Sequence, residues 1–231
     1  MNPKISIIIP TYNEEKYIDT TLFHIKKQKP YEIIVADSYS KDKTAKIAKS
    51  FGAKIIYVKR KNAATGRNAG AKISKGNILL FLDADTIVFD NLLKIIKRDF
   101  RNKNIVGWTC PVYAFSNKIK DHIIYQAFDK FVEMSINTGR PHIAGVCIAI
   151  RKSVFDKIGG FNENINILED IDLSRRLKNC GYVKISKSTC VFTSVRRIEK
   201  SGIMNLIKVY GKAYFNILMK KNRKFIYKPI R

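Results

Sequence analysis

The most constraining feature of this sequence is the alternation of two hydrophobic patterns along residues 5–100. Short apolar runs typical of buried β-strands occupy residues 5–9, 31–36, 53–58 and 78–82. Between them, apolar residues recur at helical spacing in residues 14–27, 42–51, 63–74 and 90–100. Strands that are joined through helices by short connections lie parallel in one sheet, which the helices cover on both faces. The sequence therefore predicts an α/β fold with a mainly parallel central sheet.

The second half of the chain is less regular. We predict helices at residues 119–136, 168–179 and 203–219, a short segment at 153–158, and strands at 144–150, 183–185 and 191–193. No Pro- or Ser-rich linker separates these elements. We therefore expect one domain over residues 1–200, followed by a basic amphipathic C-terminal helix and tail over residues 201–231.

The cysteines and the apolar runs limit the class of protein. The four cysteines, Cys110, Cys147, Cys180 and Cys190, form no CxxC pair. We expect buried free thiols, with a Cys180–Cys190 bridge as the alternative. The first apolar run stops at Pro10, and no uncharged stretch reaches the roughly 20 apolar residues of a membrane-spanning helix. These patterns predict a cytoplasmic protein without a signal peptide.

The charge is strongly one-sided. The chain has 44 Lys and Arg against 19 Asp and Glu, a formal net charge of +25. Such an excess attracts anions, which here means nucleic acid, an anionic membrane surface or phosphorylated small molecules. A bias toward solubility or thermostability would give the same surface. Residues 201–231 hold eight Lys and Arg and no acid, so the tail is the most basic part.

The sharpest chemical signal is a pair of carboxylates after a buried strand. Residues 81–86 read Phe-Leu-Asp-Ala-Asp-Thr, so Asp83 and Asp85 leave the carboxyl end of the predicted strand at 78–82. Ligands bind at that edge of open α/β sheets. Mg²⁺ and Mn²⁺ favour one or two carboxylates together with ligand phosphates. The structural alternative is a helix N-cap formed by Asp85 or Asp90.

Further motifs follow the other predicted strands. They are residues 10–15 (PTYNEE), 37–44 (DSYSKDKT), 64–70 (ATGRNAG), 159–163 (GGFNE) and 168–173 (LEDIDL). In this order, and with the DxD motif, they resemble the family 2 glycosyltransferases, which use nucleotide sugars and have the GT-A fold. The resemblance runs from Ile5 to Arg197. The family's Asp-Asp-Gly reads Asp37-Ser38-Tyr39 here, so only its first residue transfers.

The resemblance implies a role for each matching position. At the base and ribose of the donor, the resemblance implies Thr11, Tyr12 and Glu14, with Asp37 on the base. Arg67 and Asn68 would lie near the ribose and diphosphate, and Asp83 at the ribose or metal. Arg196 and Arg197 would lie over the diphosphate. The resemblance also implies Asp85, with Asp83, as the metal ligand and Asp170 as the catalytic base.

The chemistry that these roles require is a single displacement. A metal and arginines neutralise the charge that develops on the leaving diphosphate, and a carboxylate takes the proton of the acceptor hydroxyl. One base without a covalent nucleophile implies inversion at the anomeric carbon. The expected partners are a nucleotide-diphospho-sugar, a saccharide or lipid-linked acceptor, and Mn²⁺ or Mg²⁺.

Several of these residues have structural alternatives. Tyr12 fits a core aromatic, and Asp37 a turn-forming residue. Asp170 and Asp172 fit acids in the first turn of a helix, which is the favoured interpretation for Asp172 alone. We expect a structural role for His142 rather than contact with an acceptor. Gly66 and Gly70 fit residues that only permit close packing.

The predicted C-terminal helix carries an apolar stripe. Its members are Ile203, Leu206, Ile207, Tyr210, Tyr214, Ile217 and Leu218. The basic residues of the segment 220–224 follow. This pattern is typical of a helix that lies on an anionic membrane, here on the cytoplasmic face. Packing on the domain or on a second copy, as in a homodimer, gives the same pattern.

Two other functions remain open from the sequence. The charge of +25 would suit a nucleic-acid-binding protein. However, the edge that bears the motifs is rich in carboxylates, which repel phosphate in the absence of a metal, so we predict no specific nucleic-acid binding. A non-catalytic scaffold with the same fold is disfavoured by the presence of Asp85 and Asp170.

Overall fold

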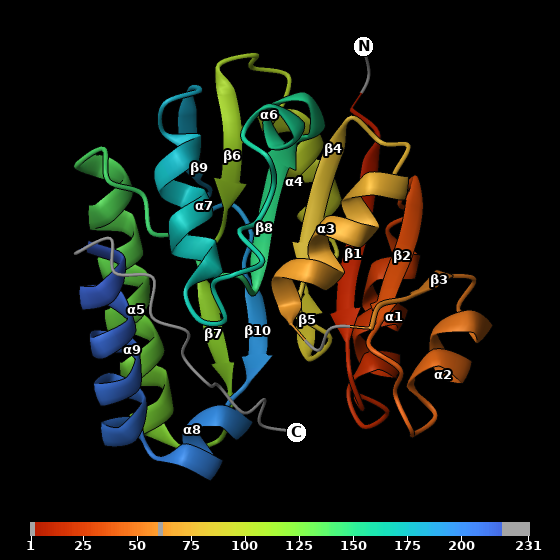
Figure 1. The fold of residues 1–231 in the computed structure, drawn as a ribbon, viewed down its shortest axis with the longest axis horizontal. Helices are drawn as coiled ribbons and strands as arrows, with labels where there is room; N and C mark the ends of the chain where they lie inside the picture. The colour runs from red at the N-terminus through yellow and green to blue at the C-terminus, as the bar shows by residue number, and fades with distance from the viewer. Residues whose placement is uncertain (1–2, 60–61, 219–231) are drawn as a thin grey trace.

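The structure, a computed structural model, describes residues 3–59 and 62–218. A central sheet is flanked by helices on both of its faces (Figure 1). Its seven strands run in the order β3 (Lys54–Tyr57), β2 (Glu32–Asp37), β1 (Ile5–Thr11), β4 (Ile78–Leu82), β8 (Cys147–Arg151), β6 (Ile105–Thr109) and β9 (Tyr182–Ile185). All neighbouring pairs are parallel except those of β8, which runs antiparallel to β4 and β6. The predicted mainly parallel α/β sheet is confirmed.

Helices connect the strands as the alternating pattern predicts. They are α1 (Ile18–Lys27), α2 (Thr44–Ser50), α3 (Ala63–Ile73), α4 (Leu92–Asp99), α5 (Ile119–Asn137), α6 (Lys152–Lys157), α7 (Glu169–Leu177), α8 (Arg196–Ser201) and α9 (Ile203–Leu218). Alternate residues of β1 face opposite sides of the sheet: Ile7 and Ile9 belong to the core beneath α1 and α4, whereas Ile8 belongs to the core beneath α3 and α7. Two hydrophobic cores therefore hold the sheet between helices.

Gly70 sets the distance between α3 and β1. A Cβ atom at this position would lie 2.4 Å from Cγ2 of Ile8, which is too close for any side chain. At Gly66, one turn earlier, a Cβ atom would lie 3.0 Å from Cβ of Pro10. Both glycines permit close packing, as the structural alternative stated. This contact draws the start of α3, which carries Arg67, against the carboxyl end of β1.

A second, three-stranded sheet was only partly foreseen. It has the order β5 (Thr86–Val88), β10 (Val191–Ser194) and β7 (Val112–Phe115), and of these strands the sequence predicted only β10. The central strand, β10, pairs antiparallel with β5, with Thr193 opposite Thr86. This pairing brings β10 beside the segment that follows the DxD motif, and α8 comes directly after β10 (Figure 1).

The C-terminal helix both packs on the domain and leaves apolar residues exposed. Leu206 and Ala213 of α9 are buried, and the hydroxyl of Tyr214 lies 3.0 Å from Nε2 of His142. Ile207 of the stripe is more than half exposed, as are Met204 and Phe215 beside it. The stripe thus fits neither expectation alone, and the basic segment 220–224 lies outside the described residues. His142 has the structural role that was expected of it.

Two further expectations concern the thiols and the membrane. All four cysteines are free, and Cys110 and Cys147 are buried, so the alternative Cys180–Cys190 bridge is absent. Within residues 3–59 and 62–218, no helix combines the length and the apolar character that a bilayer span requires.

Candidate active site

The DxD motif lies where the sequence placed it, at the carboxyl end of β4. Its two carboxylates have different partners, because Asp83 accepts a bond from Nη2 of Arg67 at 2.9 Å and Asp85 lies 3.0 Å from Nε of Arg196. Asp83 is 30% exposed, whereas Asp85 is only 9% exposed. Among the described residues, no three His, Cys, Asp or Glu side chains converge as metal ligands.

Arg67 joins three segments that are distant in the sequence. From α3 it donates to Asp83, to Oε1 of Glu169 at 2.7 Å and to the carbonyl oxygen of Gly145 at 3.1 Å. Its side chain is 3% exposed, and its guanidinium lies over the ring of Phe161. The two carboxylates offset the desolvation of this buried guanidinium, whose Nη1 and Nη2 have partners while its Nε is buried without one among the described residues. Arg67 holds the DxD motif and the ED motif (Glu169 and Asp170) together.

Asp170 is a partly buried carboxyl in the first turn of α7. Its Oδ2 accepts a bond from the backbone N–H of Gly145 at 2.6 Å, and its Oδ1 accepts one from Ile171 at 2.8 Å. Burial and the neighbouring charge of Glu169 raise the pKa of Asp170 to about 7, against the opposing effect of Arg67 and the two N–H groups. A carboxyl with this pKa exchanges a proton near neutral pH, as a general base must.

Arg196 binds the carboxylate that was predicted to hold the metal. Its Nη1 and Nη2 donate to the two oxygens of Glu14 at 2.7 and 3.0 Å, while its Nε faces Asp85. The guanidinium lies over the ring of Tyr17, 4.6 Å from the centroid. Burial, together with the charges of Asp83 and Glu14, raises the pKa of Asp85 to about 6, although Arg196 opposes this rise. Glu14, assigned to the nucleotide, here holds an arginine.

The ends of β1 and β2 form a second part of the site. Oδ1 of Asp37 accepts a hydrogen bond from the hydroxyl of Thr11 at 2.9 Å, and Oδ2 accepts one from the N–H of Ser40 at 2.8 Å. Asp37 therefore forms the turn that the structural alternative predicted. Tyr39 follows with a φ of 55°, in the left-handed region, and its ring stacks 5.4 Å from that of Tyr57. Both rings are more than half exposed.

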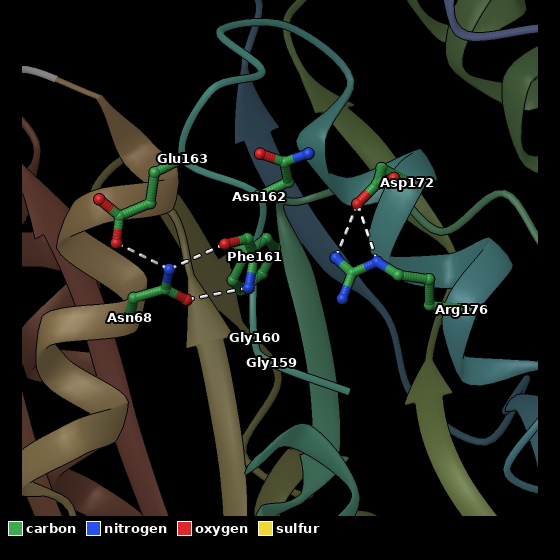
Figure 2. Close-up of a pocket in the computed structure, with 8 residues that line it drawn as sticks. All are labelled: Asn68, Gly159, Gly160, Phe161, Asn162, Glu163, Asp172 and Arg176. Atoms are coloured by element: carbon green, nitrogen blue, oxygen red, sulfur yellow. Dashed lines mark hydrogen bonds and ion pairs between the residues drawn. The ribbon is translucent and has the colours of Figure 1, made fainter. Parts of the chain in front are cut away.

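Asn68 contacts a loop rather than the DxD motif. Its amide donates to the carbonyl oxygen of Phe161 and to Oε1 of Glu163, and its oxygen accepts the N–H of Phe161. These residues line a pocket of about 520 Å³, with Asp172 and Arg176 on the opposite wall (Figure 2). The pocket does not include the DxD carboxylates. In this structure Asn68 thus fixes the loop after α6.

The remaining assigned residues are at the edge of the site. Arg197 donates to the hydroxyl of Tyr210 on α9 at 2.7 Å, and so it links α8 to α9. Tyr12 is half-buried beside Thr11 at the end of β1. Asp172 lies in the first turn of α7, as its structural interpretation stated, and it pairs with Arg176 one turn along the helix.

Sequence reasoning gave no role to three aromatic residues of the site. Tyr17 supports Arg196, Tyr57 stacks on Tyr39, and burial together with the charge of Asp85 raises the pKa of Tyr125 to about 12. Tyr57 had an available signal, because it lies near the end of the predicted strand at residues 53–58, and the structure aligns it with Asp37 of the neighbouring strand. Tyr125 had none, since it is one of several aromatics along α5.

Comparison with known proteins gives consistent results. A family model described as glycosyl transferase family 2 matches residues 6–159. A glycosyltransferase of Rickettsia typhi is 30% identical over an alignment that covers 95% of this chain and 73% of the relative. An O-antigen chain rhamnosyltransferase of Salmonella anatum is 28% identical, over 84% of this chain and 66% of the relative.

Solved structures show the same fold at low sequence identity. A mannosyltransferase of Pyrobaculum calidifontis, in complex with GDP-Man and Mn²⁺, has a TM-score of 0.69 at 18% identity and covers 93% of this chain. S. aureus TarS in complex with UDP has a TM-score of 0.65 at 21% identity and covers 89% of this chain. The match spans only 65% and 64% of those two chains.

The sheet with one antiparallel strand and the carboxylates at the end of β4 place the molecule in the GT-A class of nucleotide-sugar transferase folds. With the family match over most of its length, the chain belongs to glycosyl transferase family 2.

Proposed function

We propose that this protein transfers a sugar from a nucleotide-diphosphate donor to an acceptor hydroxyl, with inversion at the anomeric carbon. The observation that carries the proposal is the arrangement around Arg67, which joins the DxD carboxylate Asp83 to the ED motif. Asp170, a partly buried carboxyl with a pKa raised to about 7, lies next to that junction.

Asp170 supports the proposal as the proton acceptor. As a carboxylate it would take the proton from the acceptor hydroxyl while the oxygen attacks the anomeric carbon. The N–H groups of Gly145 and Ile171 hold its oxygens in place, so the base is oriented before substrate binds. Two neighbouring carboxylates have other partners, since Glu169 is held by Arg67 and Asp85 by Arg196, and this supports a single displacement with Asp170 as the base.

The site also fits a divalent cation. Asp85, with Asp83, offers hard oxygen ligands in the number that Mg²⁺ and Mn²⁺ take from a protein when phosphates and waters complete the shell. Asp85 is buried beside Asp83 and Glu14, and this excess of negative charge favours a cation there. When bound, the cation would neutralise charge on the leaving diphosphate.

The end of β2 supports a place for the nucleotide base. Thr11, Tyr12 and Asp37 lie at the carboxyl ends of β1 and β2, and the exposed rings of Tyr39 and Tyr57 stand beside them. Aromatic faces stack on any base. We therefore add Tyr39 and Tyr57 to the proposed base site, together with Arg197 and Asn68 at its diphosphate end.

The first experiment is a thermal-shift series with UDP-, GDP- and dTDP-sugars, with and without Mn²⁺. A donor at about 100 times its dissociation constant should add about 2.7 kcal/mol to the free energy of unfolding. We expect Asp85→Asn to fold normally and to lose the Mn²⁺-dependent part of this stabilisation. The control Asp90→Asn, outside the site, should respond as wild type does. If Asp85→Asn and wild type respond alike to Mn²⁺, Asp85 is not the ligand.

We propose further that the acceptor is lipid-linked or a polysaccharide at an anionic membrane, and that α5 and α9 form the contact. The two helices lie together at one end of the molecule (Figure 1), where His142 contacts both Phe131 of α5 and Tyr214 of α9. The exposed apolar residues there are Ile119, Ile123 and Met134 of α5 and Met204, Ile207 and Phe215 of α9. Residues 201–231 contain eight Lys and Arg and no Asp or Glu, so this segment is attracted to the negative charge of an anionic leaflet.

Liposome sedimentation tests this contact. Each Lys or Arg near an anionic leaflet contributes about 1 kcal/mol, and this contribution is screened by salt. We expect the full chain to pellet with anionic vesicles at low salt and to be released at high salt. The triple variant Met204→Ser/Ile207→Ser/Phe215→Ser should pellet much less, whereas Phe23→Ser, which changes an exposed aromatic on α1, should not. Equal pelleting of the triple variant and wild type would contradict the proposal.

A further inference from the structure

The guanidinium of Arg196 occupies the space between two acidic residues at the predicted metal site. It forms a two-pronged pair with Glu14, with N–O distances of 2.7 and 3.0 Å, and its Nε lies 3.0 Å from Oδ2 of Asp85. The Glu14 side chain is 1% exposed and the Arg196 side chain 16% exposed. One oxygen of the carboxylate that would bind a cation is therefore already neutralised by a cation from the chain itself.

We propose that Arg196 is a resident counter-ion that keeps a divalent cation away from Asp85 until a donor diphosphate is present. This inference rests on the proposed function. A metal ion and a guanidinium cannot occupy the same side of one carboxylate, and their like charges repel strongly in a partly buried site. A metal ion alone gains too little binding free energy at Asp85 to displace Arg196. A metal ion together with a diphosphate gains more binding free energy, because the phosphate oxygens complete the coordination shell of the metal and also attract the arginine.

The pairing of β10 with β5 explains why Arg196 lies between Glu14 and Asp85. Strand β10 pairs with β5 so that Thr193 lies opposite Thr86, the residue that follows Asp85. Arg196 is the first residue of α8, three positions beyond this pair, and its guanidinium rests on the ring of Tyr17. The strand pairing fixes the backbone, and the aromatic face limits the positions of the side chain.

The same geometry limits how far Arg196 moves when it is displaced. Glu14 is buried and would be costly to leave without a cation, so we expect it to keep its two-pronged contact. Displacement of Arg196 by the metal then breaks only the contact between Nε of Arg196 and Asp85. A guanidinium that starts 3.0 Å from the metal ligand remains within reach of any diphosphate held by that metal. Arg196 would serve first as a counter-ion and then as a phosphate ligand.

Mn²⁺ binding, followed through the electron paramagnetic resonance signal of the free ion, tests this proposal without an activity assay. The wild-type protein should bind Mn²⁺ alone weakly and bind it much more tightly with saturating UDP or GDP. Arg196→Gln should bind Mn²⁺ alone at least about tenfold more tightly than wild type, and so the coupling between metal and nucleotide should shrink. Arg196→Lys, which keeps the positive charge, should bind Mn²⁺ alone as weakly as wild type.

Controls separate a site effect from a general change of charge. Arg176→Gln removes an arginine that pairs with Asp172 on α7, and it should leave Mn²⁺ affinity unchanged. Adding Asp85→Asn to Arg196→Gln should abolish the gain, and circular dichroism should show that each variant is folded. The proposal is overturned if Arg196→Gln binds Mn²⁺ alone no more tightly than wild type, or if Arg176→Gln gives the same gain. A wild-type protein that binds no Mn²⁺ with either nucleotide contradicts the proposed function itself.

Discussion

Asp170→Asn is expected to lower turnover by roughly 10²–10⁴-fold while donor affinity stays close to that of wild type. Asparagine has nearly the same shape as aspartate, and its oxygen can still accept the N–H of Gly145, although its amide nitrogen cannot accept that of Ile171. It cannot accept the proton of the acceptor hydroxyl. The loss should therefore appear in the rate and not in donor binding, which titration calorimetry measures separately. Steady-state kinetics with the donor identified by thermal shift gives the turnover.

A matched control and a pH profile sharpen this prediction. Asp172→Asn changes another first-turn acid of α7, one that pairs with Arg176, and it should leave turnover within a few-fold of wild type. A base must be deprotonated to act. Because the pKa of Asp170 is raised to about 7, kcat/KM should fall about tenfold per pH unit on the acid side of neutrality and level off above it. Wild-type turnover in Asp170→Asn would assign the base to another carboxylate.

Arg67→Met should lower the free energy of unfolding by about 3–5 kcal/mol, the usual cost of removing one partner from a buried ion pair. Methionine fills much of the volume but leaves the carboxylate of Glu169 buried and without its cation. The carbonyl oxygen of Gly145 also loses a donor. Urea unfolding, with the slope of the transition checked for constancy, measures the loss.

The control for this prediction is an arginine with a similar partner at the surface. Arg176 pairs with Asp172, but the two side chains are 32% and 24% exposed. Partly exposed pairs of this kind contribute about 0–1 kcal/mol, so Arg176→Met should be nearly neutral. If the two variants lose equal stability, the Arg67 contacts add nothing beyond those of an ordinary surface pair.

The large sheet was predictable because its strands carry their own signal. The runs at residues 5–9 and 78–82 became β1 and β4, with nearly the predicted bounds. Strands β5, β6 and β7 were missed, since each has only three to five residues and lies within a segment without regular polar alternation. Such strands acquire their conformation from their partners, which are distant in the sequence.

The site was predictable as a set of residues but not as a set of contacts. The family resemblance singled out Arg67 and Arg196, and the position of two carboxylates after a buried strand singled out Asp85. Nothing in the sequence showed that Arg196 would bind Glu14 and Asp85, because that contact depends on the pairing of β10 with β5. The partners of Asn68 were likewise hidden, since they belong to a loop more than 90 residues away.

The position of β10 in the small sheet has a consequence for the order in which the protein assembles on the ribosome. β10 is the middle strand, so β5 and β7 have no partner until residues 191–194 have been synthesised. A nascent chain that stops before this point can already pair β1 with β2, β3 and β4, because these contacts are local in the sequence. Its acidic edge, however, still lacks Arg196. The site is thus completed only after residue 196 has been synthesised, and until then Glu14 and Asp85 lack the arginine that pairs with both of them.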